Sequence, residues 1–263
     1  MGARAIPDAR RKLTHYRDLL IELVVRDMKL RYKRSVLGIV WSLLNPLAQL
    51  LVFLFVFRYV LPLNVPNYPL FLFTGILAWT WFQQSLQYAA GAIVDNAPLI
   101  RQPGFPPGIL PVATVVAQMI NYVLALPVLA AFVLWIQGPL TSAVVAIPLV
   151  MAVQFLVTLS LAYLVATSHV RFRDTQYLLG VALMLGFYLT PVFYRSEAMP
   201  SNYATIYRLN PLVHVIEAYR TIVLDGRIPQ LLPLGTVAAA ALVVLGVSYA
   251  LFRHASHHFI EEL

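Results

Sequence analysis

The chain has 263 residues, of which 60% are hydrophobic and only 11% are charged. An ordinary soluble domain carries about 25% charged residues, so this composition excludes a soluble globular enzyme. The net charge of +8 lies mainly in residues 1–35, which hold ten of the 19 basic side chains and four acidic ones. The rest of the chain has no basic stripe of the kind that binds nucleic acid. The absence of cysteine excludes disulfides, thiol nucleophiles and Cys-ligated metals.

The first predicted element is an amphipathic helix over residues 13–34. Its apolar side chains recur on one face with helical period, and its charged side chains lie on the other. Such a helix lies in the membrane interface, with its cations at the level of the lipid phosphates. It is either a topology anchor alone or also a binding site for the phosphate head group of an anionic lipid substrate. The cations of this predicted head-group site are Arg26, Lys29, Arg31, Lys33 and Arg34.

Long stretches without Asp, Glu, Lys or Arg follow, and a membrane-spanning helix needs about 20 such apolar residues. The turn Gln137-Gly138-Pro139 divides the longest stretch into two. We therefore predict an all-α integral membrane protein with six transmembrane helices, near residues 36–60, 69–93, 108–135, 143–168, 175–194 and 231–252. Residues 1–35 are then a cytoplasmic interface segment, residues 36–252 a transmembrane domain, and residues 253–263 a cytoplasmic tail.

Lys and Arg side chains predict the orientation, because short cytoplasmic loops are enriched in them. They occur in the N-terminal segment, in loops 94–107 and 169–174 and after the last span, whereas loops 61–68 and 136–142 have none. Both termini are therefore expected in the cytoplasm. The cores of the predicted spans hold no ionisable group of the kind on which ion-coupled carriers depend, so the energy for transport is expected to come from another polypeptide.

Uncharged polar and aromatic side chains share faces of the predicted spans. One interpretation is hydrogen bonding between helices together with aromatic anchoring at the membrane surface. The other is a path for a sugar chain, whose C–H faces stack on rings and whose hydroxyls bond to amides. The predicted path aromatics are Trp41, Trp81, Tyr88, Phe187, Tyr188 and Tyr194.

The loop over residues 94–107 contains a short predicted helix with Asp95 as its N-cap. The loop is either an ordinary connection or a docking site for a soluble partner, with Leu99 and Ile100 exposed on the cytoplasmic side. The residues of this predicted coupling loop are Asp95, Asn96, Leu99, Ile100 and Arg101.

Residues 195–230 are predicted to form short re-entrant or surface helices on the outer side. Asn210-Pro211 begins a helical stretch that Asp225-Gly226 ends, and this stretch is too short and too charged to cross a bilayer. It is either a lid at the outer mouth or a cap on the bundle. The predicted gate residues are Asn210, Pro211, Glu217, Tyr219 and Arg220.

No catalytic constellation is recognisable in the sequence. The outer acids Glu197, Glu217 and Asp225 are scattered. The histidines at 254, 257 and 258 have a spacing that suits a metal, but a hydrated helix end is the favoured interpretation. A membrane enzyme acting on polyprenyl-linked sugars is the alternative from another class, and it would need acidic, histidine or basic residues converging on one membrane face.

Several motifs, in order along nearly the whole chain, resemble those of the ABC-2 type polysaccharide-export permeases, which serve O-antigen, capsule and teichoic acid export. They are Arg31-Tyr32 with Ser35-Val36-Leu37-Gly38, Trp41 and Pro46; the segment from His169 to Asp174; Thr190-Pro191-Val192 with Tyr194; and Leu209-Asn210-Pro211 with Tyr219-Arg220.

This resemblance implies a bacterial inner-membrane transporter subunit and not an enzyme. It implies that two copies of the permease pair with two copies of a separate ATPase, which binds ATP and Mg²⁺, while the permease itself binds no cofactor. A lipid-diphosphate-linked polysaccharide then moves through a channel between the permeases. The coupling loop contacts the ATPase, and residues 195–226 gate the outer exit. An O-antigen-like polymer is favoured, with wall teichoic acid or a capsular polysaccharide as the alternatives.

Overall fold

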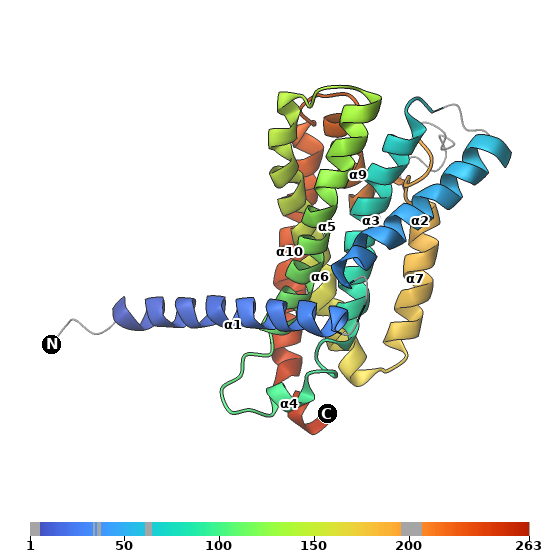
Figure 1. The fold of residues 1–263 in the computed structure, drawn as a ribbon. Coiled ribbons are helices and arrows are strands. Elements are labelled where there is room, and N and C mark those ends of the chain that lie inside the picture. Colours follow the sequence, from blue (N-terminus) through green and yellow to red (C-terminus); the bar gives the residue numbers. More distant parts are fainter. Residues whose placement is uncertain (1–5, 34, 36–37, 61–64, 196–206, 263) are drawn as a thin grey trace.

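The computed structural model describes residues 6–33, 35, 38–60, 65–195 and 207–262, and within these ranges the chain forms helices and no strand. The long helices form a bundle, and α1 (Ile6–Tyr32) runs across it near one end (Figure 1). Leu23 and Val24 of α1 are buried against the bundle, whereas Tyr16 and Leu30 remain about half exposed. This arrangement agrees with the predicted amphipathic helix, which begins earlier than residue 13.

Among the described residues, three helical stretches are long and apolar enough to cross a membrane. They are α5 (Ile109–Ile136), α6 (Ile147–Arg171) together with the preceding 3-10 turn η3 (Ser142–Ala146), and α10 (Leu231–Ser256). α3 (Tyr68–Gly91) also has the length of a span, but Gln83, Gln84 and Gln87 near its end reduce its hydrophobicity. These four elements match predicted spans within a few residues.

The first and fifth predicted spans contain shorter α-helices of 15 residues, namely α2 (Trp41–Phe55) and α7 (Thr175–Leu189). Helical backbone extends α2 at both ends, through the 3-10 turn η1 (Gly38–Val40) and the π turn η2 (Val56–Val60). α7 ends because Thr190 precedes Pro191 and adopts an extended conformation. The boundary expected at residue 194 is therefore several residues too late for the α-helix.

α3 is the central helix, in contact with α2, α5, α6, α7 and α9 (Pro211–Val223). Most of its side chains are buried on every face, from Leu70 to Phe82. α10 packs along α6, and Figure 1 shows α10 on the opposite side of the bundle from α2 and α7. This arrangement leaves α2 and α7 with exposed apolar faces, which include Val52, Phe55, Leu178 and Leu185.

The two ends of the bundle differ in what they carry. Figure 1 shows α1, the short helix α4 (Ala97–Ile100) and the carboxyl end with α11 (Phe259–Glu262) at the lower end, and α9 near the upper end. The predicted head-group cations and the coupling loop therefore share one end of the molecule. The predicted outer gate lies near the other end.

Candidate functional site

A direct hydrogen bond joins α1 to the predicted coupling loop. Arg26 Nη2 donates to Asn96 Oδ1 at 2.5 Å, and Asn96 Nδ2 donates to the carbonyl oxygen of Ala92 at 2.8 Å. Arg26 also lies 3.3 Å from Asp27 and is half-buried. This cation, which the sequence places in the head-group site, therefore ties α1 to the loop that follows α3.

We expect alanine at Arg26 and alanine at Asn96 each to destabilise the α1 contact, and the double variant to be little worse than either. A hydrogen bond to a charged group contributes about 1.5 to 3 kcal/mol, and residues that share one bond couple by about 0.5 to 3 kcal/mol. Thermal unfolding of the four proteins measures this coupling. Lys29→Ala is the matched control, and strictly additive effects of the two substitutions would contradict the contact.

The coupling loop is only partly exposed. Asp95 and Arg101 are exposed and Leu99 is half-buried, but Ile100 is 4% exposed and packs in the core. The expectation that Ile100 lies exposed beside Leu99 is therefore wrong, because successive helical residues point in different directions and only Leu99 retains accessible surface. Asp95 lies over the end of α3, where a Cβ atom on Gly91 would lie 2.5 Å from its Oδ2.

Arg31 points into the bundle. Its guanidinium stacks on the ring of Tyr88, 3.6 Å from the ring centre. With the Gln118 amide oxygen turned toward α1, this oxygen accepts a hydrogen bond from Arg31 Nη2 at 3.0 Å. Lys29 and Lys33, by contrast, are exposed and have no hydrogen bond or ion pair within the described ranges. Arg34 lies outside the described residues.

A buried polar cluster continues inward from Arg31. In the same orientation, the Gln118 amide nitrogen donates to Gln84 Oε1 at 3.0 Å, and Asn121 lies 2.9 Å from that nitrogen. Gln118 and Asn121 were not among the predicted site residues. Their spacing of three positions within an otherwise apolar helix was the available signal, since such residues face the same side and seek partners.

The cluster borders a small cavity that Trp81, Gln84 and Tyr122 help to line. Its volume of about 20 Å³ is enough for one water molecule. Trp81 is buried, and its Nε1 has no hydrogen-bond partner among the residues that the structure describes. The rings of Trp81 and Tyr122 lie 5.2 Å apart and those of Tyr122 and Tyr219 5.6 Å apart, so aromatic contacts lead from α3 through α5 to α9.

The predicted path aromatics divide into exposed and buried groups. Trp41, Tyr88 and Tyr188 are 44%, 48% and 57% exposed, whereas Trp81 and Phe187 lie in the core. Tyr194 is half-buried, and its hydroxyl donates to the carbonyl oxygen of Tyr188 at 3.1 Å. Within one chain, only the exposed members of the set are accessible to a sugar.

An aromatic cluster that the sequence did not reveal joins α2 to the segment after α7. Phe53 lies 5.7 Å from Phe187 and 5.6 Å from Phe193, and Phe57 lies 5.4 Å from Phe193. Offset aromatic pairs of this kind contribute about 0.5 to 1.5 kcal/mol each beyond their area burial. α2 and the end of α7 are therefore held together by rings, although neither helix is long.

Arg220 of α9 binds three backbone carbonyl groups. Its Nη1 donates to Pro191 at 2.6 Å, its Nη2 to Val192 at 2.7 Å and its Nε to Phe71 at 3.4 Å. The guanidinium also lies 3.4 Å from the centre of the Phe71 ring. Burial lowers the pKa of Arg220 to about 9, which leaves the group charged at neutral pH. Arg220 thus connects α9 to α3 and to the segment after α7.

The other predicted gate residues lie along the same helix. Asn210 caps α9 by accepting from the Leu212 amide at 3.0 Å, and its Nδ2 donates to Thr190 Oγ1 at 2.9 Å. Pro211 occupies the first helical position, Glu217 is half-buried, and Tyr219 is buried. Asn210 and Arg220 therefore hold the segment from Thr190 to Val192 from two points on α9.

Gly75 of α3 allows this segment to approach closely. A Cβ atom there would lie 2.7 Å from the carbonyl oxygen of Val192 and 2.9 Å from Arg220 Nη2. Tyr68 adds a further contact, since its hydroxyl donates to the carbonyl oxygen of Phe193 at 3.1 Å. The absence of a side chain at position 75 is thus part of the Arg220 site.

No group of three or more potential metal ligands occurs in the described parts of the chain. The histidines at 254, 257 and 258 lie at the end of α10 and are exposed.

Comparison with known proteins connects these features to a family. The family described as ABC-2 type transporter matches residues 18–224. The O-antigen export system permease protein RfbA of Myxococcus xanthus is 37% identical over 256 residues, which cover 96% of this chain and 98% of that protein. RfbA of Klebsiella pneumoniae is 31% identical over 249 residues, covering 94% and 95%. The polysialic acid transport protein KpsM of Escherichia coli is 27% identical over 237 residues, covering 88% and 91%.

Proposed function

The chain belongs to the ABC-2 type transporter family, and from this we propose that it is the permease subunit of an ATP-driven exporter of a lipid-diphosphate-linked polysaccharide. The observation that carries the proposal is the 37% identity, over nearly the full length of both chains, with a protein named as an O-antigen export permease. An O-antigen-like polymer is therefore the first candidate substrate. The lower similarity to a polysialic acid transport protein makes a capsular polysaccharide the second.

The proposed topology has six spans in the bacterial inner membrane with both termini in the cytoplasm. Three helical stretches have the length and composition of spans, and α2, α3 and α7 supply the other three. The lack of Lys and Arg in residues 61–68 and 136–142 supports placing these loops outside. Residues 1–35 then form the interface segment, residues 36–252 the transmembrane domain and residues 253–263 the tail.

The proposed assembly has two copies of this permease and two copies of a separate ATPase, to which ATP and Mg²⁺ bind. The exposed apolar faces of α2 and α7 support pairing of the permeases, since a second copy could cover them. Trp41 of α2 and Tyr188 of α7 are exposed on these helices. A second copy facing them would place exposed aromatic side chains on both sides of a path. Many weak stacking contacts suit a sliding polymer, whereas a few strong contacts would retain it.

In the proposed mechanism, the lipid diphosphate first meets Lys29 and Lys33 at the cytoplasmic surface. Closure of the ATPase dimer displaces the coupling loop, and the hydrogen bond from Arg26 to Asn96 transmits this displacement to α1. At the outer end, α9 and the segment it binds through Arg220 form the gate. The energy source is separate from this chain, which supplies the path and the contacts.

Co-expression with a candidate ABC ATPase from the same genome tests the proposed function. We expect the two subunits to co-purify, and loss of this permease to leave undecorated lipid on the cell surface while polymer accumulates in the cytoplasm. Chemical analysis of the accumulated polymer distinguishes O-antigen, capsule and teichoic acid. Normal surface polymer in cells that lack the permease would contradict the proposal.

We expect Leu99→Asp to lower stimulated ATP hydrolysis and export by about tenfold, while the protein still folds. Leu99 is a half-buried apolar side chain of α4 beside the exposed Pro98, and an interface anchor that loses its apolar contact costs more than about 1 kcal/mol. ATPase assays of the reconstituted complex check this expectation. Arg101→Asp is the polar control on the same loop, and a fully stimulated L99D complex would exclude docking through this helix.

A further inference from the structure

The carboxyl end of the chain packs against the predicted coupling loop. Among the helices that the structure describes, α4, which carries Leu99, makes its most extensive contact with α11. α11 also contacts α6. Figure 1 shows α4 and the carboxyl end side by side at the lower end of the bundle. The residues after α10 therefore bring a second short helix to the helix that we expect to meet the ATPase.

Neither α4 nor α11 is long enough to be stable by itself. Each has four residues, and isolated helices shorter than about 12 residues are marginal in water. Ile100 of α4 is 4% exposed and Phe259 of α11 is 1% exposed, and both belong to the hydrophobic core. Burial of one large apolar side chain therefore holds each helix, and the position of α4 depends on the neighbour that it contacts.

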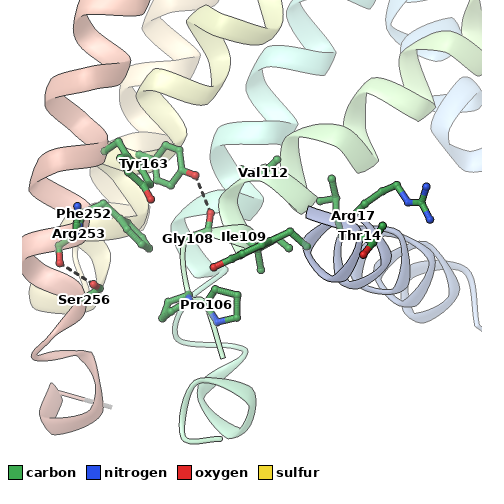
Figure 2. A pocket seen from close by; sticks show the side chains of 14 residues that line it. Thr14, Arg17, Pro106, Gly108, Ile109, Val112, Tyr163, Phe252, Arg253 and Ser256 are labelled. Atoms are coloured by element: carbon green, nitrogen blue, oxygen red, sulfur yellow. Dashed lines mark hydrogen bonds between the residues drawn. The ribbon is translucent and has the colours of Figure 1, made fainter. Parts of the chain in front are cut away.

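Phe259 lies at the end of a row of three aromatic rings. Its ring is 5.3 Å from that of Phe252 of α10, and the Phe252 ring is 5.1 Å from that of Tyr163 of α6, both edge to face. Figure 2 shows Phe252 near Tyr163, whose hydroxyl donates to the carbonyl oxygen of Gly108 at 2.8 Å. Gly108 directly precedes α5. The same row of rings therefore supports α11 and the end of the loop that contains α4.

The outward side of α4 and α11 is accessible. Pro98 of α4, Glu262 of α11 and the intervening His257 and His258 after α10 are exposed, and Leu99 is half-buried. A soluble partner that binds α4 would therefore lie beside α11 as well.

We propose that α11 is a positioning element for ATPase docking: Phe259 anchors α11 on the bundle, and α11 holds α4 with Leu99 in the orientation that the ATPase binds. This inference rests on the proposed function, since it presupposes an ATPase that docks at α4. Phe259 is a positioning residue, because it is buried and acts through α4. If the binding-competent position is populated in only about a tenth of the molecules, the apparent affinity for the partner falls about tenfold.

The first test follows α4 in the permease alone. The chain has no cysteine, so Arg101→Cys provides a single site for a spin label at the exposed end of α4. We expect Phe259→Ala to change the EPR spectrum of this label from a largely immobile to a largely mobile form, because loss of the ring frees α11. Phe259→Leu keeps an apolar side chain and should preserve the immobile form. His258→Ala removes an exposed ring at the preceding position and is the matched control.

The second test adds a purified ABC ATPase to the permease in nanodiscs. In F259A we expect the ATPase concentration at half-maximal stimulation of hydrolysis to rise about tenfold. The maximal rate and the Tm of the permease should change little, because a chain end can open locally while the bundle stays folded. F259L and H258A should behave like the unsubstituted permease.

An immobile label in F259A would overturn the proposal, and so would an unchanged half-maximal ATPase concentration despite a mobile label. A fall in Tm together with the maximal rate would also overturn it, because Phe259 would then serve the stability of the whole bundle. Absence of stimulation by the unsubstituted permease would contradict the proposed function instead, and the spin label would still show whether Phe259 holds α4.

Discussion

Replacement of Arg220 by methionine is expected to lower the free energy of unfolding by about 3 kcal/mol or more. Methionine retains much of the aliphatic length but leaves the carbonyl groups of Pro191 and Val192 buried without their donors. Each buried polar group left without a partner costs about 1 to 3 kcal/mol. Thermal unfolding of the purified permease should show a fall in Tm of about 6 to 12 °C.

Two further variants separate this contact from a general loss of charge. Arg220→Lys keeps the charge but cannot reach three carbonyl groups with one ammonium group, so we expect an intermediate loss of stability. Arg227→Met removes an exposed arginine from the segment that follows α9 and should change the free energy of unfolding by about 0.5 kcal/mol or less. An unchanged Tm in R220M would show that the segment after α7 is held by other contacts.

Gly75 provides an independent approach to the same site from α3. Gly75→Ala leaves every hydrogen-bonding group in place but puts a Cβ atom against the carbonyl oxygen of Val192. The segment at Val192 and the Arg220 guanidinium then have to move, and the fall in Tm should resemble that of R220M. If instead G75A is neutral while R220M is not, the charge of Arg220 matters more than the close packing.

The long helices were predictable because their signal is local. Between residues 102 and 170 the chain has no charged side chain, and the turn at Gln137-Gly138-Pro139 separates α5 from α6 as expected. α1 was likewise visible from its helical period. The carboxyl end of α7 was harder to predict. Pro191 forces Thr190 out of the helical conformation, but the hydrophobic run continues to Tyr194 and suggests a later end.

The contacts of the candidate site were less predictable, because they depend on partners far away in the sequence. A basic residue in an interface helix suggests a free cation, yet Arg31 stacks on Tyr88 and meets Gln118 of α5. Arg26 is likewise engaged by Asn96, 70 residues away. The predicted set of head-group cations mixed two kinds of residue, and only packing distinguishes them.

This distinction leads to an expected result for the two exposed cations. We expect Lys29→Glu combined with Lys33→Glu to lower export by at least about tenfold while Tm stays unchanged. Each basic residue near an anionic surface contributes about 1 kcal/mol to attraction, and charge reversal turns this attraction into repulsion. Surface export of the polymer in cells, together with the Tm of the purified complex, measures both parts of this expectation.

Arginine at the two positions is the matched control, since it keeps the charge and should preserve export. Arg31→Leu should instead lower Tm, because it removes the contacts of Arg31 with Tyr88 and Gln118. Normal export in the double charge-reversal variant would remove Lys29 and Lys33 from substrate capture. Since neither lysine has a partner within the described ranges, a fall in export at constant Tm is the result expected from lost attraction at the membrane surface, and co-purification of the ATPase with the variant tests whether the contact between the subunits is kept.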